Sequence, residues 1–143
     1  MLSNELTIDK LQEFMDYATA LKKNYKLQEV RELAGNFIKN YPETYAGYSI
    51  MAGINRQEKD YQSAIKNYEK SLSCLSENDS PTFAISHSLA YCYIKIHNYE
   101  KAIQNLHVSK KHVFFRDQAV WYLVESYIRL NDNKNARKFL NLL

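Results

Sequence analysis

Two thirteen-residue stretches decide the fold: Lys59-Asp-Tyr-Gln-Ser-Ala-Ile-Lys-Asn-Tyr-Glu-Lys-Ser71 and His97-Asn-Tyr-Glu-Lys-Ala-Ile-Gln-Asn-Leu-His-Val-Ser109. In both, a Tyr is followed three places later by Ala-Ile, then by Asn before a large side chain, and finally by Ser. A third copy, at 131–140, carries the same Ala at Ala136. Such internal similarity indicates that the chain is built from repeated units, which sets its architecture before any local prediction is made.

The Ala of this motif recurs at a nearly constant spacing. Ala102 and Ala136 are 34 residues apart, and so are Ala64 and Val30, which occupies the slot in a fainter first copy. Between Ala64 and Ala102 the spacing is 38, so four residues are inserted there. A period of this length predicts stacked supersecondary units, each of which cannot bury its apolar face alone.

A helix is expected before each motif, because four residues in each preceding segment follow the i, i+3, i+4, i+7 spacing of one helical face. The sets are Phe14, Tyr17, Ala18 and Leu21; Tyr48, Met51, Ala52 and Asn55; Ser86, Leu89, Ala90 and Tyr93; and Val120, Leu123, Val124 and Tyr127. We therefore predict eight helices in four pairs, at roughly 7–23, 27–40, 43–57, 61–75, 81–96, 99–111, 115–130 and 133–143.

This pattern resembles the tetratricopeptide repeat (TPR), a helix–turn–helix unit of about 34 residues with small residues at fixed slots. The resemblance implies an all-α fold, a right-handed superhelical stack of antiparallel helix pairs. It implies one domain spanning 1–143, with repeats at about 11–44, 45–78, 83–116 and 117–143. It also implies that the first helix of each pair lines a concave surface.

Composition excludes several other classes of protein. With 3 Gly and 2 Pro, the chain is poor in the residues that tight β-turns require. No apolar run approaches the ~18 residues of a membrane span, and the opening residues do not form a secretory signal. Cys74 and Cys92 fit no disulfide or metal spacing, which favours a cytoplasmic location.

Motifs for catalysis are missing from the sequence. The four histidines show no metal-ligand spacing, and no Gly-rich phosphate loop or nucleophile elbow occurs. We therefore expect no enzyme, no cofactor and no metal site. The remaining hypothesis is a protein-interaction scaffold, adaptor or chaperone-like, which holds a peptide or helix of another protein in the concave groove.

Side chains on the first helices, off the packing stripe, are the candidates for that groove. We predict partner binding by Ile50, His87, Tyr91, Trp121, Tyr122 and Glu125. Aromatic residues dominate the set, and Trp and Tyr provide large contact areas at low entropic cost.

Two alternatives stay open at this point. Residues 95–143 hold nine basic and four acidic side chains, so a helical-repeat RNA binder could use this third of the chain with Tyr91, Trp121 and Tyr122 for base stacking. The small overall charge of +3 speaks against nucleic acid as the main partner. The other alternative is self-assembly into a homo-oligomer through an apolar C-terminal edge of Leu140, Leu142 and Leu143.

Overall fold

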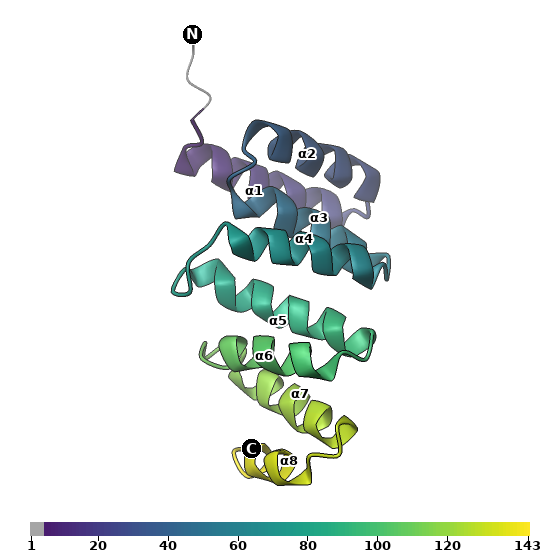
Figure 1. Ribbon diagram of the computed structural model, residues 1–143. Coiled ribbons are helices and arrows are strands. Elements are labelled where there is room, and N and C mark those ends of the chain that lie inside the picture. The colour runs from purple at the N-terminus through teal and green to yellow at the C-terminus, as the bar shows by residue number, and fades with distance from the viewer. Residues whose placement is uncertain (1–4) are drawn as a thin grey trace. The chain divides into compact units, whose positions relative to one another are not determined.

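The computed structural model describes residues 5–143, and all regular structure within that range is helical (Figure 1). The helices are α1 (Ile8–Lys23), α2 (Leu27–Asn40), α3 (Tyr45–Gln57), α4 (Tyr61–Ser73), α5 (Ser80–Lys95), α6 (Tyr99–Ser109), α7 (Arg116–Arg129) and α8 (Asn133–Leu140). Every predicted helix is present, and no end differs from the prediction by more than three residues. None of these described helices has the length and apolar character needed to cross a membrane.

The turn inside each helix pair repeats the spacing of the sequence motif. One residue in each turn adopts a left-handed conformation, with φ between 57° and 63°: Tyr25, Lys59, His97 and Asn131. The amide of the following residue bonds to the carbonyl five positions earlier, at 2.8–2.9 Å, which is the Schellman ending of a helix. These turns are 34, 38 and 34 residues apart, so the backbone repeats as the sequence does.

Side-chain caps start the second helix of three pairs. The side chains of Asp60, Asn98 and Asp132 each accept a hydrogen bond from the backbone N–H three residues later. Such caps satisfy an amide that the helix leaves unpaired. In the first pair, Lys26 stands at this position and makes no side-chain cap. This difference fits the fainter motif of the first repeat.

Small residues at the repeat slots are buried where paired helices meet. The motif slot is filled by Val30, Ala64, Ala102 and Ala136, and all four are buried. The small slot on the preceding helix is filled by Ala18, Ala52, Ala90 and Val124, which are buried as well. The burial predicted for these slots is therefore confirmed, and the Ala residues let the paired helices approach closely. Tyr17, which the spacing placed on the buried face of α1, is instead 55% exposed.

The four pairs group into two compact units. The predicted single domain over 1–143 stays a prediction. Unit 1 (Met1–Cys74) contains α1–α4, and unit 2 (Leu75–Leu143) contains α5–α8. In unit 1, the rings of Phe14 and Phe37 stack with their centroids 3.9 Å apart. In unit 2, the core gathers buried side chains of α5–α8, including Leu106, Leu123 and Phe139.

Candidate functional site

A buried histidine connects three helices of unit 2. The Nδ1 atom of His87 on α5 lies 3.1 Å from Oγ of Ser109 on α6, and its Nε2 lies 2.6 Å from Oε1 of Gln118 on α7. An amide oxygen can only accept, so Nε2 carries the hydrogen and donates it to Gln118. The ring also stacks on Phe115 and lies 5.8 Å from the ring of Tyr122. We call His87, Ser109, Gln118 and Tyr122 the His87 junction.

Larger side chains surround this junction on the first helices of unit 2. Tyr91 is half-buried one turn after His87 on α5, and the ammonium of Lys95 lies 5.2 Å from the centre of its ring. On α7, Trp121 is 58% exposed, while Glu125 is exposed one turn further along. We call Tyr91, Trp121, Tyr122 and Glu125 the α5–α7 face. It combines aromatic surface with one carboxylate, and the ammonium of Lys95 lies beside it.

Two predicted groove residues lie inside the units. Ile50 of α3 is only 8% exposed and belongs to the unit 1 core, together with Phe37 and Ala46. His87 is equally buried, at the junction described above. The other four predicted residues make up the α5–α7 face and keep at least part of their surface accessible. Partner binding by any of the six stays a prediction.

The predicted assembly edge is open at the end of α8. Leu140, Leu142 and Leu143 are all exposed. Sequence reasoning missed a second exposed apolar pair, Val113 and Phe114, in the loop between α6 and α7. The sequence contains a signal for this pair, because Val113 and Phe114 are adjacent apolar residues with basic side chains before and after them.

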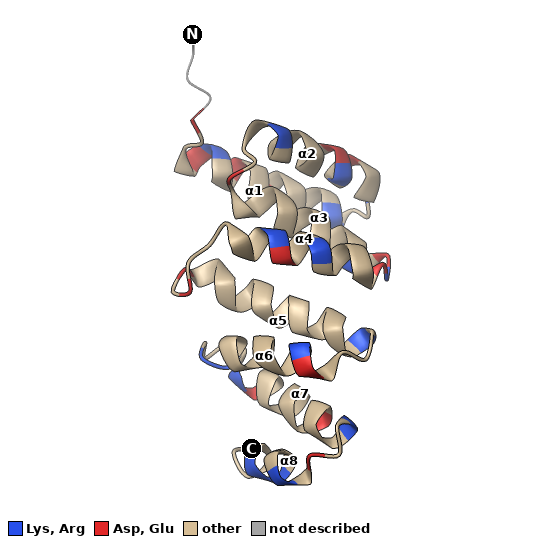
Figure 2. Cartoon of the chain, in the orientation of Figure 1, with Lys and Arg blue, Asp and Glu red and all other residues tan. Residues whose placement is uncertain are grey.

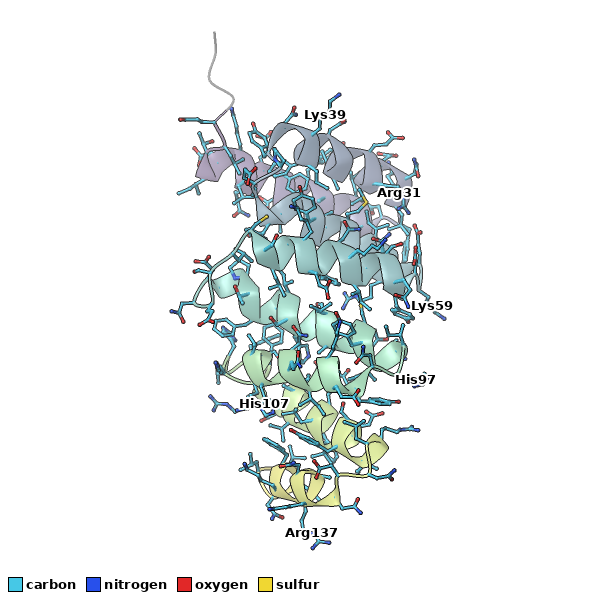
Figure 3. The ribbon with its side chains drawn as sticks, viewed as in Figure 1. Arg31, Lys39, Lys59, His97, His107 and Arg137 are labelled. Carbon is cyan, nitrogen blue, oxygen red and sulfur yellow. The ribbon has the colours of Figure 1, made fainter. Side chains whose placement is uncertain are left out.

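Within residues 5–143, no three His, Cys, Asp or Glu side chains gather closely enough to hold a metal ion. His107 of α6 is labelled in Figure 3. Burial lowers the pKa of this histidine, and the positive charges of Lys110, Lys138 and Lys111 lower it further. Burial and the nearby Arg56 lower the pKa of Lys22 in unit 1. Unit 2 thus carries a concentration of cations around the end of α6.

Comparison with known proteins gives a match by structure alone. No protein-family model matches the sequence, and no curated protein matches it. Among solved structures, MamA aligns with a TM-score of 0.78 at 13% identity, over 92% of this chain and 74% of MamA. A tetratricopeptide repeat protein from Parabacteroides merdae aligns with a TM-score of 0.76 at 19% identity, over 92% of this chain and 51% of that chain.

A third similar structure is that of a secretion chaperone. SycD, the type III secretion translocator chaperone of Yersinia enterocolitica, aligns with a TM-score of 0.71 at 11% identity, over 92% of this chain and 90% of SycD. Identities this low establish the fold alone. The chain therefore has the all-α, TPR-like fold that the repeated Ala-Ile motif predicted.

Proposed function

We propose that this protein is an interaction scaffold that holds a peptide or helix of another protein against the α5–α7 face. The observation that carries the proposal is the exposure of Trp121, 58%, on a helix whose opposite side is packed into the unit 2 core. Exposed Trp flanked by Tyr is a frequent anchor of binding energy at protein interfaces.

Rigidity of the underlying structure supports this choice of face. His87 holds α5 against α7 through its hydrogen bond to Gln118 and its ring contact with Tyr122, and against α6 through its hydrogen bond to Ser109. A binding surface that is already ordered loses less entropy when a partner docks. Lys95 and Glu125 add charges of both signs, which suits a segment with one apolar stripe and polar flanks.

The fold comparison supports the class of function. Helical-repeat proteins commonly hold other proteins, and SycD is by its description a chaperone. We carry over to this chain only that general activity, the holding of another protein. The α5–α7 face then supplies the specific contacts.

Affinity capture with three baits tests the proposal. Wild type, the double variant Tyr91→Ala/Trp121→Ala and the control Tyr17→Ala are compared in lysate of the native cell. Tyr17 is a suitable control because its exposed fraction, 55%, is similar to the 58% of Trp121, while it lies on α1 of unit 1. We expect a protein that wild type and the control retain and that the double variant loses by more than about tenfold. Equal capture by all three baits would move the binding site away from the α5–α7 face.

Direct titration then identifies the bound segment. Trp121 is the only tryptophan of the sequence, so its fluorescence reports on this face without a label. Peptides of the captured protein should change that signal in a saturable way. A captured protein whose peptides leave the emission unchanged would indicate a different site.

Self-association through the predicted assembly edge is a second candidate function. The observation that favours it is the exposure of three Leu side chains within four residues, Leu140, Leu142 and Leu143. Replacement of Leu142 and Leu143 by Ser should lower the mass measured by light scattering while helicity stays constant. An unchanged mass would count against this candidate.

A further inference from the structure

The loop between α6 and α7, residues 110–115, presents two adjacent apolar side chains to solvent. Val113 is 76% exposed and Phe114 is 79% exposed, more than any other large apolar side chain described in unit 2. Scattered exposed apolar residues are normal, but an aliphatic and an aromatic residue together at the tip of a loop are not explained by packing. We call this pair the apolar tip.

The apolar tip is held outward by the structure of the loop. Phe115 points inward, where its ring stacks on His87 with the centroids 5.0 Å apart. The ring of Phe114 meets Phe115 edge-on, and its backbone N–H donates to Nδ1 of His112 at 3.2 Å. The backbone N–H of Phe115 bonds to the carbonyl of His112, which closes the turn. The outward orientation of the tip is therefore set before any partner arrives.

Cations surround the apolar tip. Lys110 and Lys111 precede it and Arg116 follows it, as Figure 2 shows by the blue segments around this loop. No acidic residue occurs in residues 101–116. Lys138 of α8 is a further cation near the end of α6, because it lowers the pKa of His107 together with Lys110 and Lys111. The apolar tip thus stands within a basic surface of unit 2.

From this arrangement we infer that unit 2 docks on an anionic lipid surface, with Val113 and Phe114 entering the headgroup layer and Lys110, Lys111 and Arg116 facing lipid phosphates and carboxylates. Amphipathic surfaces with apolar residues beside basic ones bind at the membrane interface in this way. The cations provide the attraction to anionic lipid, about fivefold in affinity for each Lys or Arg near the surface.

Other partners match this loop less well. Single-stranded nucleic acid uses several aromatic faces on which successive bases stack, whereas the apolar tip offers one aromatic ring, that of Phe114, beside the aliphatic Val113. A protein partner would require a groove or an edge into which the pair fits. A lipid surface requires neither, only exposed apolar side chains with cations beside them.

Vesicle co-sedimentation of the full chain tests the inference. Vesicles of phosphatidylcholine alone are compared with vesicles that contain about 30% phosphatidylserine, at low salt and at physiological salt. We expect binding only to the anionic vesicles, with the bound fraction falling as salt rises. Val113→Ser/Phe114→Ser should lower the affinity at least about tenfold, because the apolar contribution is removed.

Two further variants separate the contributions. Lys110→Glu/Lys111→Glu should also abolish binding to anionic vesicles, while leaving the apolar tip intact. Ile128→Ser is the matched control, since Ile128 is a 54% exposed apolar residue of α7 at the other end of that helix, and it should bind like wild type. Circular dichroism of each variant verifies that the helices are retained.

Several outcomes would overturn the inference. Wild type that binds neither vesicle would exclude a lipid surface as the partner. Equal binding by wild type and Val113→Ser/Phe114→Ser would show that the apolar tip does not enter the membrane. Tighter binding to an oligouridine than to anionic vesicles, lost in the same double variant, would assign the loop to nucleic acid instead. None of these outcomes affects the α5–α7 face, because Trp121 and Tyr91 are unchanged in all variants.

Discussion

Residues 72 positions apart occupy the same place in units 1 and 2, as Val30 and Ala102 do, or Ala64 and Ala136. At the meeting point of the first three helices, unit 2 has the polar His87 junction of His87, Ser109, Gln118 and Tyr122. The corresponding residues of unit 1 are Met15, Phe37, Ala46 and Ile50, all of which contribute to its apolar core. The same backbone positions are thus filled by a hydrogen-bonded network in one unit and by hydrocarbon in the other.

The residues next to these positions also differ between the units, with larger side chains in unit 2. Tyr91, Trp121 and Glu125 of unit 2 correspond to Thr19, Ser49 and Gly53 of unit 1. Small side chains at these places leave little surface that could anchor a partner, whereas the aromatic residues of unit 2 offer a large one. The slots shared by both units thus specify packing, whereas the positions outside those slots determine which side chains each unit offers on its surface.

The largest effect is expected where α2 and α3 of unit 1 come closest. A Cβ atom added at Gly47 would lie 2.6 Å from Cγ1 of Ile38 and 3.3 Å from its backbone nitrogen. The corresponding residue of unit 2 is Ala119, which is buried without such a conflict. Gly47→Ala should therefore lower the free energy of unfolding by about 1–3 kcal/mol, measured by urea denaturation.

Gly35→Ala provides the control for this prediction. Gly35 lies within α2, and a Cβ added there would meet nothing within 4 Å. The substitution should raise the free energy of unfolding by about 0.5–1 kcal/mol, because Ala loses less backbone entropy in a helix. If Gly47→Ala were as stabilising as Gly35→Ala, α2 and α3 would not be in close contact at Gly47.

Exchanging the equivalent residues Met15 of unit 1 and His87 of unit 2 should destabilise the two units by different amounts. Met15→His places an imidazole beside the apolar core of unit 1, where Phe37 and Ala46 offer no hydrogen-bonding side chain, and should cost about 1–2 kcal/mol. His87→Met should cost less, because the hydroxyl of Ser109, freed from Nδ1 of His87, can donate to the carbonyl of Leu106, 3.3 Å away, and Gln118 can turn to water. Hydrogen exchange localises each loss to its unit, and equal losses would contradict the comparison.

A smaller gain is expected at the turn of the second helix pair. Lys59 adopts a φ of 63°, a conformation that Gly reaches at no steric cost. Lys59→Gly should raise the melting temperature by a few degrees, corresponding to about 0.5–1 kcal/mol. Asn131→Gly in unit 2 is the comparison, and its gain should be smaller because Asn tolerates this conformation. A loss of stability at Lys59→Gly would show that its side chain contributes more than the strain costs.

The smallest effect is expected in the pH dependence of the free energy of unfolding, to which histidines contribute in unit 2 alone. All four histidines lie in unit 2. Burial and three lysines hold the pKa of His107 below the ordinary histidine value of 6.5, so the unfolded chain binds this proton more readily than the folded chain. Stability contributed by neutral His107 should therefore be present above pH 6.5 and be lost as the pH falls below it. Urea midpoints at neutral and mildly acidic pH should fall less for His107→Gln than for wild type, and an identical fall would contradict this role.

Most of the fold could be predicted from the sequence because its signals are local and repeated. The 3.6-residue helical period and the recurring Ala slot depend on nearest neighbours along the chain, and eight helix positions follow from them. For the candidate site, the structure gives only the accessibility of the predicted residues. Tyr91, Trp121, Tyr122 and Glu125 keep surface accessible, whereas Ile50 and His87 are buried. The spacing along a helix could not predict this difference, because it does not specify how large the neighbouring side chains are.

The sequence by itself determined the helix pairs, their period and the small residues between them, since each depends on local spacing. The tertiary structure decided which side chains outside the repeat slots reach solvent. Ile50 and Tyr122 hold equivalent places, yet Ile50 is enclosed by the core of unit 1 while Tyr122 remains half-exposed beside His87. Likewise, Phe115 turns inward and Phe114 outward, although the two are neighbours in sequence. Burial depends on the shape of residues brought together from distant parts of the chain, and no period along the sequence encodes that shape.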